Sequence, residues 1–117
     1  MQSLFVVTDS PAPLGGMAFP PPGADWPALH RRGFARVVRL HPADYDPAPL
    51  VAEHVARGEG VVVHCVGGTG RTGTVLACAL RQLGRSADAA IDTVRMHRPH
   101  RPESLWQEDV VRRGALG

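Results

Sequence analysis

The chain lacks lysine altogether: its 13 basic residues are all arginine and face 11 acidic residues, which leaves a net charge of +2. A charge this small, scattered along the chain, gives no reason to expect binding to nucleic acid or to a membrane surface. No stretch reaches the about 18 consecutive apolar residues of a membrane span. The first residues also lack the basic and small-residue features of a secretory signal, so the cytoplasm is the expected location.

Cysteine is scarce as well, because the chain contains only two, Cys65 and Cys78. Two cysteines do not make a disulfide framework, which agrees with a reducing compartment where a reactive thiol survives. Five histidines show no metal-ligand spacing with one another or with cysteine, so neither a metal nor another cofactor is expected. These are His30, His41, His54, His97 and His100.

The apolar and turn-forming residues predict strands that alternate with helices along a single domain, residues 1–117. Such alternation is typical of an α/β fold, with a short, mainly parallel central sheet flanked by helices. In the third strand, Val37, Val38 and Leu40 are expected to point into the core. The expected strands are residues 4–8, 16–19, 35–40 and 60–65, and the expected helices are residues 26–32, 50–57, 72–83, 87–98 and 103–113.

Capping residues mark where these helices begin and end. Asp25 and Ser86 are expected to cap the helices at 26–32 and 87–98. Gly33 and Gly84 follow helical segments and are expected to end them.

A glycine-rich segment joins the strand at 60–65 to the helix at 72–83, in the order His64-Cys65-Val66-Gly67-Gly68-Thr69-Gly70-Arg71-Thr72-Gly73. A strand-to-helix turn can aim several backbone N–H groups at one point, and the positive end of the helix dipole adds to them. The glycines allow the backbone to curl this tightly. The segment is therefore expected to bind a phosphate group without a metal. The expected binding residues are Val66, Gly67, Gly68, Thr69, Gly70 and Arg71.

Cys65 and Arg71 stand at the two ends of this turn. A planar guanidinium binds two phosphate oxygens at once, which a lysine ammonium does not do. A thiol among N–H donors, near a helix N-terminus and an arginine, is expected to have a pKa well below roughly 8.5. Cys65 is thus a candidate nucleophile at neutral pH. The competing explanation is a buried structural cysteine beside a glycine turn.

The pattern His-Cys-x5-Arg-Thr-Gly, here HCVGGTGRTG, resembles the signature loop of the cysteine-dependent protein tyrosine phosphatase superfamily, in its small dual-specificity-like branch. The similarity continues to Gln107 and covers roughly the last two thirds of the chain. The resemblance implies a tyrosine-phosphatase-like fold and a metal-independent phosphatase that works through a phosphocysteine intermediate. The implied partner is a phosphorylated protein, carrying phosphotyrosine or, as further substrates, phosphoserine and phosphothreonine.

Three other loop types fit this segment less well. A nucleotide-binding P-loop needs a lysine before its Ser or Thr. Rhodanese-like loops are shorter between the Cys and the closing basic residue. Low-molecular-weight tyrosine phosphatases carry their Cys-x5-Arg at the extreme N-terminus, whereas Cys65 lies in the middle of this chain.

The loop after the strand at 35–40 contains a second candidate group, Asp44. The resembled family uses an Asp upstream of the Cys to protonate the leaving group, and Ala-Asp-Tyr-Asp-Pro resembles that loop, although 21 positions to Cys65 are fewer than in most relatives. The following helix would run about 16 Å away from this loop and the next strand about as far back, so Asp44 can lie at the same sheet end as Cys65. Asp46 is the alternative acid, and both residues could instead be ordinary turn or helix-capping residues.

The resemblance also implies supporting roles for three residues. His64 would brace the loop, Thr72 would donate its hydroxyl to the Cys65 sulfur, and Gln107 would position the hydrolytic water. Each has a plainer explanation, as a buried imidazole, a residue of the first helical turn and a surface glutamine. Cys78 lies in an apolar helix and is expected in the core.

Two other functions stay open at this stage. One is a phosphatase of a non-protein phosphoester, such as an inositol lipid, a nucleotide or an RNA end. Lipid specialists usually carry lysine in the loop, where this chain has Val66, Gly67 and Thr69. The other is a catalytically weak phosphate-binding module, against which the intact Cys65 and Arg71 argue. No sequence feature indicates an oligomeric state.

Overall fold

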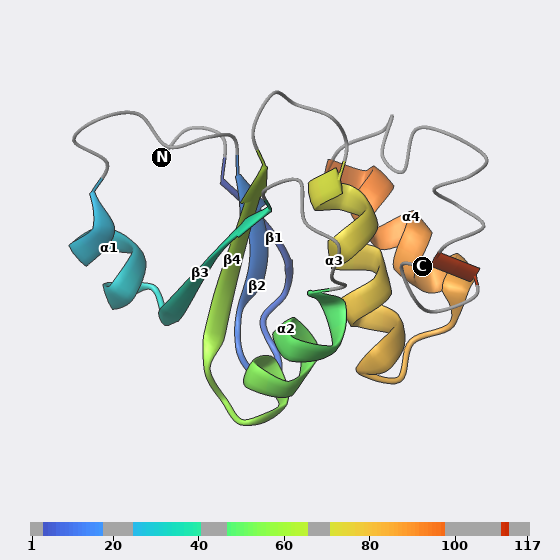
Figure 1. Cartoon of the computed structure of the whole chain (residues 1–117), viewed down its shortest axis with the longest axis horizontal. Coiled ribbons are helices and arrows are strands. Elements are labelled where there is room, and N and C mark those ends of the chain that lie inside the picture. Colours follow the sequence, from blue (N-terminus) through green and yellow to red (C-terminus); the bar gives the residue numbers. More distant parts are fainter. Residues whose placement is uncertain (1–3, 18–24, 41–46, 66–70, 98–110, 113–117) are drawn as a thin grey trace.

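Four strands form a mixed sheet at the centre of the molecule, and helices cover both of its faces (Figure 1). The computed structural model describes residues 4–17, 25–40, 47–65, 71–97 and 111–112. The strands are β1 (Phe5–Thr8), β2 (Leu14–Met17), β3 (Phe34–Leu40) and β4 (Gly60–Cys65). The helices are α1 (Trp26–Arg31), α2 (Ala48–Ala56), α3 (Arg71–Gln82) and α4 (Ala87–His97).

The strands lie in the order β1-β2-β4-β3, so the chain crosses from β2 through β3 to the central β4. β1 runs antiparallel to β2, whereas β2 and β3 both run parallel to β4. Strands and helices alternate from β2 onward, which places helices on the sheet faces, as parallel connections require. The predicted α/β class with a short, mainly parallel sheet is confirmed. Within the described residues, no helix has both the length and the apolar character needed to span a membrane.

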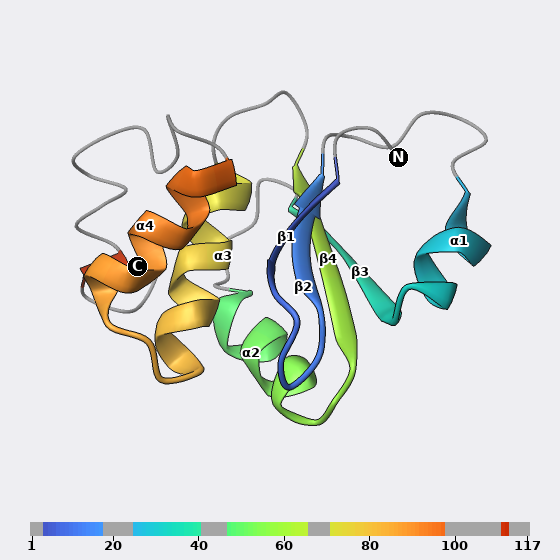
Figure 2. The same cartoon turned by 180° about the vertical axis from the view of Figure 1, so that it is seen from behind.

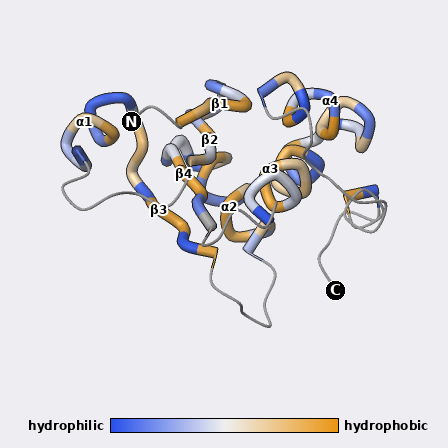
Figure 3. The backbone as a smooth tube through the Cα atoms, turned by 90° about the horizontal axis from the view of Figure 1, so that it is seen from above, coloured by the Kyte–Doolittle hydropathy of each residue, from blue (hydrophilic) through white to orange (hydrophobic). Residues whose placement is uncertain are grey.

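The two faces of the sheet carry separate apolar clusters. On one face, Val61 and Val63 of β4 pack with residues of α2, α3 and α4 in the larger cluster. On the other face, Val62 packs with Leu29 of α1 and with Phe34 in a much smaller one. Figure 3 shows this layering from above, with α1 by itself on one side of the sheet, and Figure 2 shows it from behind. The alternating directions of the valines explain why β4 is buried on both faces.

Strand β2 begins two residues before the predicted start at Gly16, because it runs from Leu14 to Met17. Glycines are poor strand formers, so the sequence alone did not indicate that the strand begins before Gly16. Pairing on both sides overrides this preference, since Gly15 lies between Val6 of β1 and Val62 of β4. The remainder of the predicted strand, residues 18–19, lies outside the described residues.

The prediction that Val37 points into the core is wrong, because its side chain is 45% exposed. Val38 and Leu40 do pack against the larger cluster, as predicted. Neighbouring residues of a strand point to opposite faces, and Val37 pairs with Val62, which faces α1. Helix α1 is only six residues long and leaves Val37 exposed on this face.

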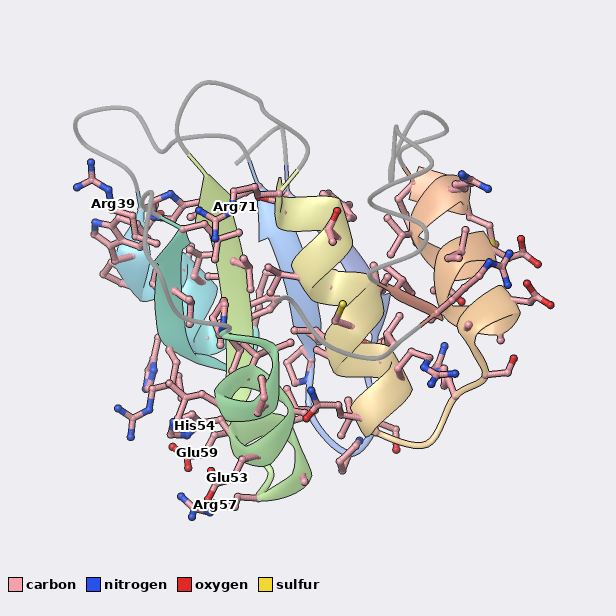
Figure 4. The ribbon with its side chains drawn as sticks, turned by 45° about the vertical axis from the view of Figure 1, so that its right-hand side comes forward. Arg39, Glu53, His54, Arg57, Glu59 and Arg71 are labelled. Carbon is pink, nitrogen blue, oxygen red and sulfur yellow. The ribbon has the colours of Figure 1, made fainter. Side chains whose placement is uncertain are left out.

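A bulge in β3 turns Arg36 toward the end of α2. The register shifts between Phe34 and Arg36, and the Nε of Arg36 then donates a hydrogen bond of 3.3 Å to Glu59. The other carboxylate oxygen of Glu59 is hydrogen-bonded to Nδ1 of His54 in α2, at 3.2 Å. The hydrogen bond with His54 and then that with Arg36 hold the pKa of Glu59 below its usual value. This cluster ties α2 to β3 at the opposite end of the sheet from Arg71 (Figure 4).

Two helices, α1 and α4, begin at the predicted capping residues. The carboxylate of Asp25 accepts a hydrogen bond from the N–H of Ala28, at 3.0 Å, and Ser86 Oγ accepts one from Ala89, at 3.1 Å. Helix α2 starts after Pro47, which makes no side-chain cap, and Asp46 lies outside the described residues. The predicted last helix is described only at residues 111–112, which are helical.

Candidate active site

The three parallel strands end at the same edge of the sheet. Met17 of β2 pairs with His64, and Leu40 of β3 pairs with Cys65, the last residue of β4. The chain leaves the sheet at this edge after each of the three strands, into residues 18–24, 41–46 and 66–70. The carboxyl ends of parallel strands are where α/β proteins bind ligands. This edge is therefore the candidate site.

Cys65 and Arg71 bound the predicted phosphate-binding turn from its two sides. Strand β4 ends at Cys65 and helix α3 begins at Arg71, one residue before the predicted start. Arg71 is half-buried and lies beside the end of β4, and Arg39 lies at the same end of the sheet (Figure 4). The five residues between Cys65 and Arg71 lie outside the described residues, so their predicted contacts with phosphate stay a prediction. They are Val66, Gly67, Gly68, Thr69 and Gly70.

Thr72 lies in the first turn of α3 with its side chain buried. Its Oγ1 is buried and makes no hydrogen bond to any of the residues that the structure describes. A buried hydroxyl needs a partner, because leaving it unpaired costs about 1–3 kcal/mol. The partner predicted for it, the sulfur of Cys65, belongs to a side chain outside the described set. The predicted role of Thr72 therefore stays a prediction.

His64 occupies the position before Cys65 and is buried on the α1 face of the sheet. Burial, and to a lesser degree the positive charge of Arg39, lower the pKa of His64 below its usual value. Arg39 is the register partner of His64 on β3. This shift favours the uncharged imidazole, and the predicted role of His64 as a brace for the loop stays a prediction.

Asp44 and Asp46 lie outside the described residues, but the two ends of their loop are described. Leu40 precedes the loop and is the ladder partner of Cys65, and Pro47 follows it directly before α2. The loop that contains both acids thus starts at the side of Cys65. This agrees with the distance argument made from the sequence, while the choice between Asp44 and Asp46 stays a prediction. Gln107 also lies outside the described residues.

Cys78 lies in the middle of α3 and is fully buried among apolar residues, as predicted. Cys78 forms no disulfide with the described residues, and it has no access to solvent. Among the described residues, no three of the side chains His, Cys, Asp or Glu come together as a metal site requires.

Sequence reasoning did not single out Gly16, on which the first turn of α3 rests. A glycine at the start of a predicted strand, next to a second glycine, was the available signal.

Comparison with known proteins agrees with this arrangement. A family model described as a polymorphic toxin system, DSP-PTPase phosphatase, matches residues 46–85, about a third of the chain, from the end of the Asp44 loop through α3. The solved structure of a protein tyrosine phosphatase from Leishmania major has a TM-score of 0.67 to this chain. It is 19% identical in sequence, and the match covers 94% of this chain and 96% of that one. The chain has the protein tyrosine phosphatase fold.

The solved structure of Tk-PTP in its active form extends this similarity, with a TM-score of 0.67 and 23% identity over 95% of both chains. A mutant form of Tk-PTP has a TM-score of 0.68 and 22% identity, over 96% of this chain and 93% of that one. The tyrosine-phosphatase fold therefore includes the first third of the chain, where the sequence resemblance was loose. The predicted resemblance to the small dual-specificity-like branch is confirmed. Family match and fold together support a phosphatase.

Arg71→Lys is expected to be almost as damaging as Arg71→Ala. A two-pronged guanidinium contact tightens in the transition state, and a point charge cannot replace it. We expect each variant to lower kcat for an aryl phosphate by about 10² to 10³. Steady-state kinetics measure this effect, with circular dichroism to confirm that α3 is intact. A lysine variant with a near-normal rate would contradict a two-pronged contact between Arg71 and the phosphate.

Proposed function

We propose that this chain is a metal-independent protein phosphatase that hydrolyses phosphotyrosine, with phosphoserine and phosphothreonine as further substrates. The observation that carries the proposal is the position of Cys65 at the end of the central strand, between Leu40 and the turn that Arg71 closes. This position supports the proposal, because a candidate nucleophile, a candidate phosphate-binding cation and the start of the loop with the candidate acids meet at one edge. The proposed location is the cytoplasm, where a thiolate stays reduced.

In the first proposed step, the thiolate of Cys65 attacks phosphorus and the bond to the ester oxygen breaks. Arg71 and the N–H groups of the turn hold the three other phosphate oxygens, where negative charge builds up in the transition state. Asp44 gives its proton to the departing oxygen, so tyrosine or another alcohol leaves in neutral form. The product of this step is a phosphocysteine.

In the second proposed step, Asp44 is a carboxylate and takes a proton from water, while Gln107 positions that water. The water oxygen attacks phosphorus and the sulfur–phosphorus bond breaks. The Thr72 hydroxyl hydrogen-bonds the departing sulfur and stabilises it as a thiolate; its Oγ1 is buried and has no hydrogen-bond partner among the described residues. Inorganic phosphate leaves and the enzyme returns to its starting state without any metal.

Release of phosphate from matched peptides tests this proposal. Three peptides of one sequence, carrying phosphotyrosine, phosphoserine or phosphothreonine, are compared with an inositol phosphate and a nucleotide. We expect the phosphotyrosine peptide to be hydrolysed fastest, with no loss of rate in EDTA and with competitive inhibition by vanadate. Loss of activity in EDTA would rule out the proposed mechanism. A clear preference for the inositol phosphate or the nucleotide would replace the proposed substrate class, and no turnover at all would leave a phosphate-binding module.

A further inference from the structure

The first turn of α3 touches the sheet at Gly16 of β2. A Cβ atom built at Gly16 would lie 2.8 Å from Cγ2 of Thr72 and 2.9 Å from Cδ1 of Leu76. It would also lie 2.8 Å from Cζ of Phe5. All three distances are shorter than real carbon contacts, so any side chain at this position would have to push a neighbour aside. The helix and the strand lie this close only because residue 16 has no side chain.

The neighbours of Gly16 have little room to move. Leu76 is fully buried, Thr72 and Phe5 are nearly so, and all three belong to closely packed surroundings. Thr72 is β-branched, and such a side chain has few allowed rotamers in a helix. Adding a methyl group at Gly16 would therefore displace the backbone of the first turn of α3 rather than rotate one side chain.

Gly15, the preceding residue, provides a contrast. Its Cβ would point to the other face, where it would meet the backbone oxygen of Phe5 at 2.6 Å and Cζ of Phe34 at 3.5 Å. None of the three atoms nearest to this Cβ position belongs to α3. The two glycines thus allow two different close approaches, and only that of Gly16 involves the helix that begins with Arg71.

We propose that Gly16 is a positioning residue for phosphoryl transfer, because it lets the first turn of α3 lie directly on β2 and so sets where Arg71 and the helix N-terminus stand relative to Cys65. This inference rests on the proposed function. Gly16 and Cys65 share one rigid frame, since Gly16 pairs with Val63 of β4, two residues before Cys65. Arg71 is adjacent in sequence to Thr72, which rests on Gly16. A methyl group at Gly16 is expected to move the cation and the N–H donors away from the phosphate without altering any site residue.

The test compares Gly16→Ala with Gly58→Ala. Gly58 has a φ of +86° in the turn after α2, and no atom lies within 4 Å of its Cβ position, so alanine there strains the backbone at the opposite end of β4 from Cys65. Gly16→Ala is expected to lower kcat/KM for an aryl phosphate by about 10- to 100-fold, chiefly through kcat. Gly58→Ala is expected to lower the melting temperature but to leave kcat unchanged. All rates are measured well below the melting temperature of each variant.

The pKa of the Cys65 thiol is a second readout that a purely structural role would not move. It is measured from the pH dependence of alkylation by iodoacetamide, which reports on Cys65 because Cys78 is fully buried. Moving the helix N-terminus and Arg71 away is expected to raise this pKa in Gly16→Ala and not in Gly58→Ala. Alkylation needs no turnover. An inactive wild-type chain would therefore disprove the proposed function. The effect of Gly16 on the thiol pKa could still be measured, so the positioning role would still be tested.

A double variant checks the contact itself. Thr72→Ser removes the Cγ2 methyl that the new Cβ would strike and keeps the hydroxyl, so Gly16→Ala/Thr72→Ser is expected to recover part of the lost kcat and the lower thiol pKa. If Gly16→Ala does not fold, the double variant Gly16→Ala/Leu76→Val is used instead, because it removes the clash with Cδ1 of Leu76 and keeps the contact with Thr72. It is expected to show the same fall in kcat and the same rise in the thiol pKa. A normal kcat and an unchanged thiol pKa in folded Gly16→Ala would overturn the inference. Equal effects in Gly58→Ala would overturn it as well.

Discussion

Cys65→Ser is expected to abolish turnover while leaving phosphate binding intact. The serine hydroxyl has a pKa far above neutral, so it does not ionise and is a poor nucleophile, and we expect kcat to fall by roughly 10⁴-fold or more. We expect the predicted N–H donors of the turn and Arg71 to remain in place, because a sulfur-to-oxygen change at the end of β4 should not disturb the strand or α3. Phosphate release measures the first effect, and calorimetric titration with inorganic phosphate measures the second.

Cys78→Ala is the matched control for this experiment. It removes the other thiol of the chain, which lies fully buried in α3 and away from solvent. We expect it to reduce stability slightly, because it leaves a small cavity, and to retain normal turnover. A Cys65→Ser protein with more than a trace of activity would contradict the thiolate mechanism. A Cys78→Ala protein that loses turnover while it remains folded would place the second thiol in the reaction.

Asp44→Ala is expected to lower the rate by about 10² to 10⁴, as the loss of a general acid does. The loss should be small for p-nitrophenyl phosphate, whose leaving group departs almost unaided, and large for a phosphotyrosine peptide. A general acid must be protonated, so the wild-type rate falls as pH rises through its pKa, and this descending limb should flatten in the variant. Steady-state kinetics with both substrates across a pH series measure all three effects.

Asp46→Ala is the matched control on the same loop. Asp46 directly precedes Pro47, so the substitution should cost at most about 1 kcal/mol of stability as a lost helix cap, with turnover largely kept. If Asp46 instead controls rate and leaving-group dependence, the acid lies two residues further along the chain. Equal small effects from both substitutions would mean that this short loop supplies no acid, and that the enzyme acts only on good leaving groups.

The location of the candidate site was largely predictable because its signals are local. The β-branched run at 61–63, the glycines after Cys65 and the apolar helix that follows each bias a short stretch of backbone toward one conformation. The structure places β4 and α3 within one residue of the predicted bounds. Ser86 capped its helix as predicted for the same reason, since a capping hydroxyl acts on an N–H only three residues away.

The misplaced start of β2 and the exposed Val37 share a different cause. Gly15 and Gly16 form a strand only because β1 and β4 pair with them from both sides, and those partners are distant in sequence. Val37 is as apolar as Val38, and its exposure follows from the short reach of α1 on that face of the sheet. Neither partner strands nor helix coverage can be deduced from a local pattern.

The sequence by itself determined which residues are chemically competent: a thiol and an arginine separated by five residues, between a strand and a helix. Composition and spacing suffice for this, because a short turn holds its own ends close together. Only the tertiary structure decided what surrounds them. The register that sets Leu40 beside Cys65, and the contact of Thr72 with Gly16, join segments far apart in the chain. Such contacts depend on how whole elements pack, so they arise when the sheet and α3 assemble around one core.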